Sequence, residues 1–319
     1  MYASDTSFVT LTNSGTEVAR LQLTHSNPVM KNNENRFLTY GIGSSSYEIS
    51  SFDETLYSGN AENKIYTGDV ASNGTYCLVT EDNGYLTTLY AYSKNNNRIY
   101  KYSFSEYYIT SVAINKDGSG CVATGVSSDK GSAVTGVYVL DFSQEKPVST
   151  YKISGDSVLD CKYLTSDTAV LVGSQASYIV KKGEKNYKTV SYEDKTLSNY
   201  CFNTDTSTYT MALSRSGDGR SVALISYNSN GEAQYTINTE HKADSLSVYK
   251  GTVAILDGNV VYGYNQNGDL LYSTNSGTGS KKIVLASDYT AYILSVNQIR
   301  FIDLDSVSSD DTAQTSKQE

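Results

Sequence analysis

Two histidines are the only side chains of this sequence whose ordinary pKa lies close to neutral pH, so they are the first candidates for acid–base chemistry. His25 and His241 both fall in segments that we expect to join one repeated unit to the next. No Gly-x-Ser-x-Gly elbow, phosphate-binding glycine loop or His-x-x-x-His pair accompanies them. A solvated loop position is therefore the favoured interpretation of both, and we predict no catalytic residue.

Paired carboxylates are the next arrangement with chemical meaning, because a glycosidase needs two carboxyl groups about 5 to 10 Å apart. Asp303 and Asp305 alternate on the last expected strand, and Asp310 and Asp311 are adjacent near the C-terminus. The run 115–120 is similar to a calcium loop but lacks the closing glutamate. We interpret that run as a hairpin turn, and we expect neither a metal nor a cofactor.

Two long connections between expected strands carry charged residues. The first runs from Ser127 to Thr135 and the second from Ser214 to Ser221. Loops on a rigid scaffold tend to gather binding residues, although ordinary polar loops would have the same composition. We expect both connections on one face, together with Glu193 and the two histidines. The predicted ligand-binding residues are Tyr107, Asp129, Lys130, Arg215, Asp218, Arg220 and His241.

Tyrosine is unusually frequent, with 29 residues in the chain. Most stand at strand positions where alternation would bury the ring and leave the hydroxyl at an edge. Tyr107 and Tyr108 instead fall at the junction of two units. There, exposed rings would stack on sugars or pack against a protein partner.

Short strands joined by tight turns must position all of these residues. In segment 260–274 two β-rich runs flank Asn267-Gly268, a pair that tolerates the positive φ of a tight hairpin. Copies of this unit stand at 222–237 and, more loosely, at 8–23. Turn centres recur near residues 14, 53, 96, 145, 184, 230 and 267, at gaps of 37 to 49 residues. That period is typical of four-stranded propeller blades.

Seven turns predict an all-β, seven-bladed β-propeller of four-stranded blades. We expect strands from both termini to share one closing blade, which removes exposed sheet edges. One strand is then left over, because 8–11 and 299–304 both have the character of third strands. The predicted propeller covers residues 1–305, and the acidic tail 306–319 lacks the apolar content needed to fold.

Charge and cysteine usage exclude several classes of function. The formal net charge is -9, which argues against nucleic acid as a partner. No stretch reaches the length of a membrane span. The four cysteines are spaced 44, 40 and 40 residues apart, which matches no zinc motif. We expect free, buried thiols at equivalent strand positions, listed in chain order as Cys77, Cys121, Cys161 and Cys201.

The repeats, with aromatic third strands, an Asn-Gly or Asp-Gly turn and a fourth strand ending near a tyrosine, resemble the quinoprotein-type (PQQ-like) and related propeller repeats. Residues 8–304 are most similar to uncharacterised membrane-anchored propeller domains of Gram-positive anaerobic bacteria. This resemblance implies a location on the extracellular face of the membrane, or secretion, with an N-terminal anchor that precedes Met1. Enzymatic quinoproteins have docking tryptophans and vicinal cysteines, whereas this chain has no tryptophan and widely spaced cysteines.

Three hypotheses of function follow. The first is a non-enzymatic binding or scaffolding propeller at the bacterial cell envelope, which holds a protein or a cell-wall glycan on one face. The second is an enzyme of the glycosidase or lyase type with acids at a central channel. The third is an extracellular sensor domain that passes a ligand signal to a membrane segment.

Overall fold

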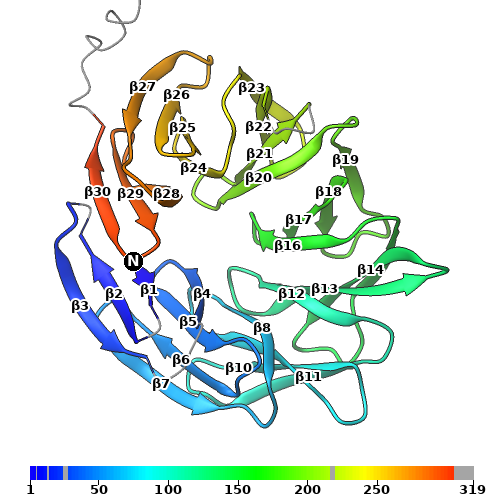
Figure 1. Cartoon of the computed structure of the whole chain (residues 1–319). Helices are drawn as coiled ribbons and strands as arrows, with labels where there is room; N and C mark the ends of the chain where they lie inside the picture. Colours follow the sequence, from blue (N-terminus) through cyan, green and yellow to red (C-terminus); the bar gives the residue numbers. More distant parts are fainter. Residues whose placement is uncertain (5, 13, 24–27, 216–219, 305–319) are drawn as a thin grey trace, which may run out of the picture. The chain divides into compact units, whose positions relative to one another are not determined.

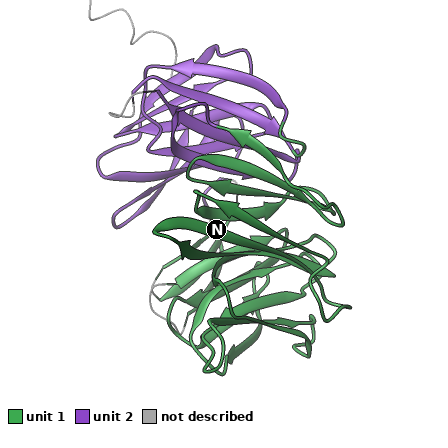
Figure 2. Ribbon diagram, turned by 90° about the vertical axis from the view of Figure 1, so that its right-hand side faces the viewer, with its two compact units in different colours: residues 1–12, 16–191, 229–231 green, residues 13–15, 192–228, 232–319 purple. Residues whose placement is uncertain are grey.

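A computed structural model of the chain describes residues 1–4, 6–12, 14–23, 28–215 and 220–304. Every regular element in these ranges is a β-strand, as the sequence predicts. None of the described segments is a helix long and apolar enough to cross a membrane. The chain divides into two compact units, shown in Figure 2, of which the first comprises residues 1–12, 16–191 and 229–231 and the second 13–15, 192–228 and 232–319.

The first unit contains five antiparallel sheets, each formed by strands consecutive in the chain (Figure 1). The first sheet has three strands and the others four. Their bounds are β1 (Tyr2–Ala3), β2 (Ser7–Leu11), β3 (Glu17–Gln22); β4 (Pro28–Asn33), β5 (Arg36–Gly41), β6 (Ser46–Ser50), β7 (Thr55–Asn60); β8 (Ile65–Val70), β9 (Tyr76–Thr80), β10 (Thr87–Tyr92), β11 (Arg98–Phe104); β12 (Tyr108–Ile114), β13 (Gly120–Asp129), β14 (Ser132–Asp141), β15 (Ser149–Ser154); β16 (Val158–Tyr163), β17 (Thr168–Gly173), β18 (Ala176–Lys181), β19 (Lys188–Ser191).

The second unit contains three sheets of the same kind, two with four strands and the last with three. Their bounds are β20 (Thr196–Asn203), β21 (Thr208–Ser214), β22 (Val222–Asn228), β23 (Ala233–Thr239); β24 (Ser245–Tyr249), β25 (Thr252–Asp257), β26 (Val260–Tyr264), β27 (Leu270–Asn275); β28 (Ser280–Leu285), β29 (Thr290–Ser295), β30 (Ile299–Asp303).

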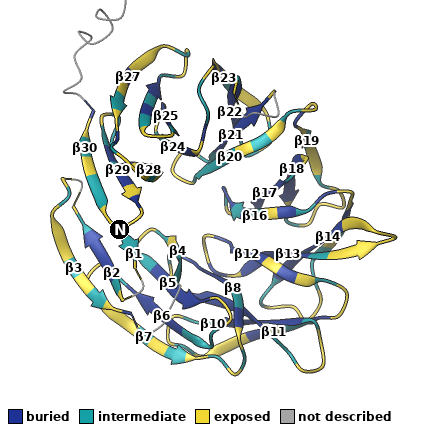
Figure 3. Cartoon of the chain, in the orientation of Figure 1, coloured by how far each residue is buried: buried dark blue, intermediate teal, exposed yellow. Residues whose placement is uncertain are grey.

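Position within a sheet decides how deeply a strand is buried (Figure 3). The second strands β9 and β17 are buried along their whole length, and both read as continuous apolar runs. Such runs are typical of strands covered on both faces. The fourth strands β7 and β27 are mostly exposed, and every second residue turns inward.

Consecutive sheets of each unit bury their apolar residues against one another. In the first unit, residues of β9 and β10 pack with residues of β12 and β13 in one cluster. In the second unit, β24 and β25 pack against β21 and β22. Each sheet therefore forms core with its neighbours, in the way that repeat proteins are stabilised.

The prediction of seven blades closed by a shared terminal blade is wrong. The described residues form eight sheets, because β1–β3 and β28–β30 are two separate three-stranded sheets. Tyr2–Ala3 pairs with Phe8 and Val9, so the N-terminal hairpin has a third strand of its own. This explains why 8–11 and 299–304 both had the character of third strands: they occupy different sheets.

The predicted long connection from Ser127 to Thr135 is also wrong. β13 and β14 continue through it as a long hairpin, and Asp129 pairs with Ser132 at its end. Lys130 and Gly131 both have positive φ, at 50° and 84°. A two-residue turn of this kind fits the right-handed twist of its strands, so it extends the ladder where we expected a loop.

All four cysteines are free thiols, as predicted, but Cys201 is only half-buried. Their positions are not equivalent, however, because Cys77 and Cys121 lie on second strands and Cys161 and Cys201 on first strands. The regular spacing of the cysteines therefore does not reflect equivalent positions in the sheets. The predicted tail 306–319, and His25 with it, lies outside the described residues.

One buried carboxylate joins the strands of the sheet β16–β19. Asp156 is 3% exposed and accepts hydrogen bonds from the backbone N–H of Ser157 at 2.7 Å and of Ser174 at 2.8 Å. The hydroxyls of Ser174 and Tyr178 donate to it at 2.7 and 2.8 Å. Asp156 therefore satisfies the donors of the turn between β17 and β18.

Replacing this carboxylate should destabilise the fold. We expect Asp156→Ala to lower the free energy of unfolding by about 3 kcal/mol, because several buried donors lose their acceptor. Urea unfolding followed by circular dichroism measures the change. The control Asp53→Ala removes an exposed carboxylate that accepts from the hydroxyl of Ser51, and it should cost less than about 0.5 kcal/mol. Equal costs for the two variants would contradict the role of Asp156.

The thiols give a second test of the fold. Cys77, Cys121 and Cys161 are buried, and burial raises the pKa of the Cys161 thiol to about 12, so it carries almost no reactive thiolate. We expect these three to resist a disulfide reagent in the native protein at pH 8, and the half-buried Cys201 to react first. In guanidinium, all four should react. A lower number of thiols in the unreduced, denatured chain would indicate a disulfide.

Candidate functional site

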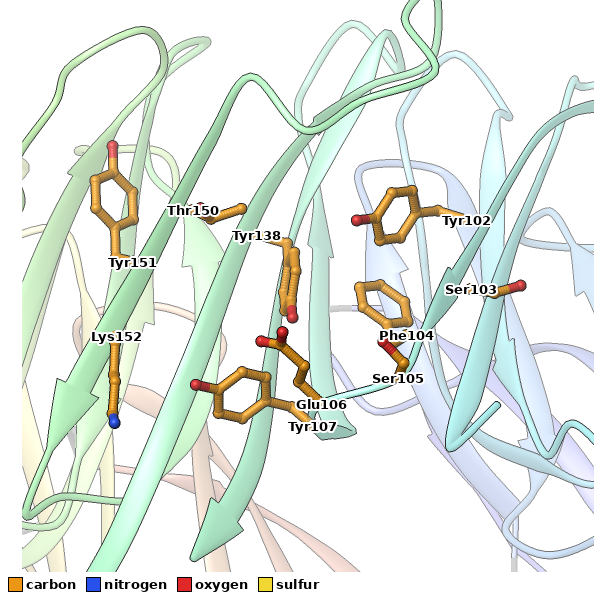
Figure 4. A pocket seen from close by; sticks show the side chains of 10 residues that line it. All are labelled: Tyr102, Ser103, Phe104, Ser105, Glu106, Tyr107, Tyr138, Thr150, Tyr151 and Lys152. Atoms are coloured by element: carbon orange, nitrogen blue, oxygen red, sulfur yellow. The ribbon is translucent and has the colours of Figure 1, made fainter. Parts of the chain in front are cut away.

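A pocket of the first unit has a volume of about 490 Å³ and opens between the outer strands of two neighbouring sheets. One side is formed by β11 and the segment that follows it, and the other by β14 and β15. Figure 4 shows the side chains that line it: Tyr102, Ser103, Phe104, Ser105, Glu106, Tyr107, Tyr138, Thr150, Tyr151 and Lys152.

Interlocking rings form the floor of this tyrosine pocket. The Phe104 ring is fully buried and meets Tyr102 and Tyr138 edge to face, with centroids 4.9 Å apart in both cases. Tyr107 approaches Tyr138 in the same manner at 6.1 Å. Edge-to-face packing is a favoured arrangement of aromatic pairs, so these rings stabilise one another's positions.

A glycine makes room for Tyr107. Gly136 lies on β14, and a Cβ atom at this position would stand well inside the van der Waals radius of the Tyr107 ring. The ring is therefore seated directly on the backbone of the neighbouring strand. Any larger residue at position 136 would displace it.

The rim of the pocket is charged. Glu106 is exposed on one side, and Figure 4 shows its carboxyl group between Tyr107 and the hydroxyl of Tyr138. Burial and, after it, the Glu106 charge raise the pKa of Tyr138, so its phenol stays neutral. On the other side Lys152 donates a hydrogen bond to Asp129 at 3.0 Å, which raises the pKa of the lysine.

Three of the predicted ligand-binding residues lie in or beside this pocket. Tyr107 lines it, and Asp129 holds the rim residue Lys152. Lys130 is exposed at the tip of the long hairpin, one residue beyond Asp129. Tyr107 and Asp129 are therefore both neighbours of Lys152, which we did not predict as a ligand-binding residue.

The other predicted residues belong to the second unit. Arg215 lines a hollow of about 340 Å³ together with Glu193, Asp194 and Lys195. The Lys195 ammonium group donates to Glu193 at 3.0 Å and lowers the pKa of that carboxyl. Arg220 is exposed.

His241 is held in place by its neighbours. Its ring stacks on Tyr262 at 3.5 Å between centroids, and its Nδ1 atom lies 3.6 Å from Asp257 Oδ2. His241 lies in the connection between β23 and β24, as predicted, but its ring is packed against Tyr262 on β26 and is not fully solvated. His25 and Asp218 lie outside the described residues.

Sequence reasoning missed most of the pocket. Tyr102, Tyr138 and Tyr151 stand on strands where alternation suggested a structural use, and Glu106 and Lys152 belong to no motif. The one local signal is the run Glu106-Tyr107-Tyr108 at a junction between two sheets. The pocket combines an apolar floor with hydroxyl groups and both signs of charge, a composition suited to ligand binding. Within the described residues, no three His, Cys, Asp or Glu side chains gather as a metal site would require.

Comparisons with known proteins bear on the fold. A family model described as "Family of unknown function (DUF5711)" matches residues 2–304. No curated protein matches the sequence at a significant level. Among solved structures, the chain is similar to the C-terminal WD40 domain of Sif2, with a TM-score of 0.61 and 15% identity over 86% of this chain and 79% of that chain.

The chain is also similar to BamB from Moraxella catarrhalis, with a TM-score of 0.57 and 12% identity over 86% of this chain and 87% of that chain. Identities this low show the fold alone. They confirm the predicted β-propeller repeats of the WD40 and PQQ-like kind, with eight sheets in place of the seven predicted blades.

The close contact between Gly136 and the Tyr107 ring can be tested by a double-mutant cycle. Gly136→Ala should cost about 2 kcal/mol of unfolding free energy in the native background, because the new methyl group overpacks the ring. In a Tyr107→Ala background the same change should cost almost nothing, since the ring is gone. Gly84→Ala is the control, because its Cβ would approach only Asp82 Oδ1, at 3.7 Å. An equal cost for Gly136→Ala in both backgrounds would show that Gly136 is not needed to accommodate the Tyr107 ring.

Proposed function

Because this chain belongs to the family of unknown function DUF5711, its role has to be derived from its own site, and we propose that it is a non-enzymatic binding propeller. The tyrosine pocket carries this proposal. Rings, hydroxyls and two opposite charges converge on one open concave surface of the first unit. A site of this composition holds a ligand by stacking and hydrogen bonding.

A cell-wall glycan is the ligand that we propose for the tyrosine pocket. Sugars present flat apolar faces, which stack on aromatic rings, and hydroxyl edges, which bond to side chains such as Ser103, Ser105 and Thr150. Glu106 accepts from hydroxyl groups and Lys152 donates to them. A pocket of about 490 Å³ lies within the usual size range of small-ligand sites.

Binding suits this pocket better than hydrolysis does. A glycosidase needs two carboxyl groups across the scissile bond. Among the described residues that line the pocket, Glu106 is the one with a carboxyl group. The site therefore has the parts to hold a sugar, but lacks the second acid that would cleave it.

The outer face of a bacterial cell envelope is the location that we propose. Its support comes from the sequence, where Tyr, Ser, Thr, Asn and Gly dominate, and from the resemblance to membrane-anchored propeller domains. A glycan-binding propeller held at that face would meet the cell wall. The alternative is that the same surface binds a protein, and the experiment below distinguishes the two.

We expect the purified protein to sediment with insoluble cell-wall polysaccharide from a Gram-positive bacterium. Tyr102→Ala and Tyr107→Ala should each weaken this binding about fivefold to tenfold, which corresponds to roughly 1 kcal/mol of lost stacking. The control Tyr289→Ala removes a ring of the second unit that is 40% exposed, and it should leave the binding unchanged. The double variant Arg215→Ala/Arg220→Ala tests whether the second unit contributes.

Urea unfolding of each variant shows whether the fold is intact. Sedimentation that is absent for the native protein, or unchanged in both pocket variants, would contradict glycan binding. If the pocket variants instead lose a protein captured from envelope extracts, the partner is a protein.

A further inference from the structure

A second group of polar side chains lies on the first strands of four successive sheets of the first unit. Lys31 is on β4, Asp69 on β8, Ser111 on β12, and Asp160 and Lys162 on β16. These strands are neighbours, because β8 packs against both β4 and β12, and β12 against β16 (Figure 1). We call these five residues the inner cluster. None of them lines the tyrosine pocket.

The two ammonium groups of this inner cluster lie near carboxylates but do not bond to them directly. Lys31 Nζ is 3.8 Å from Asp160 Oδ1, and Lys162 Nζ is 3.8 Å from Asp69 Oδ1. An N–H···O hydrogen bond spans about 2.7 to 3.2 Å. Lys162 reaches the Asn32 carbonyl oxygen at 3.4 Å, whereas Lys31 finds no hydrogen-bond acceptor in the described part of the chain.

Asp69 is the member of the inner cluster whose hydrogen-bonding groups are least satisfied. Its side chain is 2% exposed, and its Oδ2 atom accepts the backbone N–H of Ile114 at 3.0 Å. Its Oδ1 atom has no hydrogen-bond donor among the described residues. A buried carboxylate oxygen without a donor is costly, and such a group in a folded protein calls for an explanation.

Asp160 is better satisfied, which fixes the geometry of the inner cluster. Its Oδ1 atom accepts the hydroxyl of Ser111 at 3.2 Å and the backbone N–H of Cys161 at 2.9 Å. Burial alone would lower the pKa of Lys31, but Asp160 and Asp69 outweigh it and raise that pKa. Lys31 therefore stays an ammonium ion, which suits it to hold an anion and makes it a poor nucleophile.

For each of these two groups without a hydrogen-bond partner among the described residues, a ligand group of opposite charge would be the best partner. An ammonium without an acceptor is best satisfied by a carboxylate, and a carboxylate oxygen without a donor by an ammonium, because charge-assisted hydrogen bonds are the strongest. The side chains of Lys31, Asp160 and Lys162 are 30%, 26% and 21% exposed, so solvent reaches these three members of the cluster, whereas Asp69 is 2% exposed. Two lysines and two aspartates also balance in charge, so neither a free anion nor a free cation matches all of them.

We propose that the inner cluster binds a small zwitterion of the α-amino acid type. The ligand carboxylate accepts hydrogen bonds from Lys31 and Lys162, which draws the Lys162 ammonium away from the buried Asp69 Oδ1 atom. The ligand ammonium then donates to Asp69 Oδ1. Ser111 and Asp160 hold Lys31 in position. This site is independent of the proposed glycan function, because it uses other strands and another class of ligand.

L-Alanine is the first probe, in a panel with L-glutamate, L-lysine and L-leucine, with binding to the full chain measured by calorimetry. We expect at least one amino acid of the panel to bind. N-Acetyl-L-alanine lacks the ammonium group and L-alaninamide lacks the carboxylate. If alanine binds, both compounds should bind at least about tenfold more weakly; if another amino acid binds, its own capped forms serve.

Variants of the inner cluster test the two contacts separately. Asp69→Asn and Lys31→Met should each weaken the amino acid at least about tenfold. Lys116→Met is the matched control, because Lys116 pairs with Glu34 on the exposed surface at 3.3 Å, and it should leave binding unchanged. Tyr102→Ala should also leave it unchanged. Urea midpoints measured in parallel identify any variant that has lost its fold.

Two results would overturn the proposal. If no amino acid binds, the cluster is a structural ion-pair network. If acetate binds as tightly as alanine and Asp69→Asn has no effect, the cluster is a simple anion site. Should Asp69→Asn fail to fold, the capped ligands decide the matter on the native protein alone.

Discussion

The burial of both faces of the inner strands is the constraint on which the rest of this structure depends. β9 and β17 are covered along their whole length, and their apolar residues find partners in the neighbouring sheets of the first unit. One such sheet alone would leave its apolar faces in water. The fourth strands bury only some of their residues, such as Phe104 on β11 and Ile153 on β15, so their outward side chains and those of the turns are free to form sites.

The sequence predicts the strands well because their signals are local. Alternation, continuous apolar runs and turns such as Asn267-Gly268 are visible within a few residues. The number of sheets depends on pairings between segments, and here the prediction fails. Tyr2–Ala3 is too short to show a pattern, yet it gives the N-terminal hairpin its own sheet. Likewise, the polar composition of 127–135 conceals a continuous ladder that turns at Lys130 and Gly131.

The tyrosine pocket shows why a site is harder to predict than a fold. Its residues come from strands about one repeat apart, and their proximity depends on how two sheets pack. Tyr107 and Asp129 stood out because they are polar or aromatic residues at turns. Lys152 and Tyr138 look like ordinary strand residues until the neighbouring sheet is present. Gly136 is the least visible of all, since its contribution is the space that it leaves for the Tyr107 ring.

The inner cluster differs from the pocket in what it costs the fold. Two separated lysine–aspartate pairs on packed strands stabilise a sheet no better than well-packed apolar residues, because removing charges from water offsets their attraction. Asp69 Oδ2 satisfies the buried N–H of Ile114, but Asp69 Oδ1 has no donor among the described residues. Stability of the folded chain therefore accounts for one oxygen of this carboxylate and not for the other. The ligand that we propose for the inner cluster would bond to Asp69 and Lys31 together and so supply an interaction that the folded chain itself lacks among its described residues.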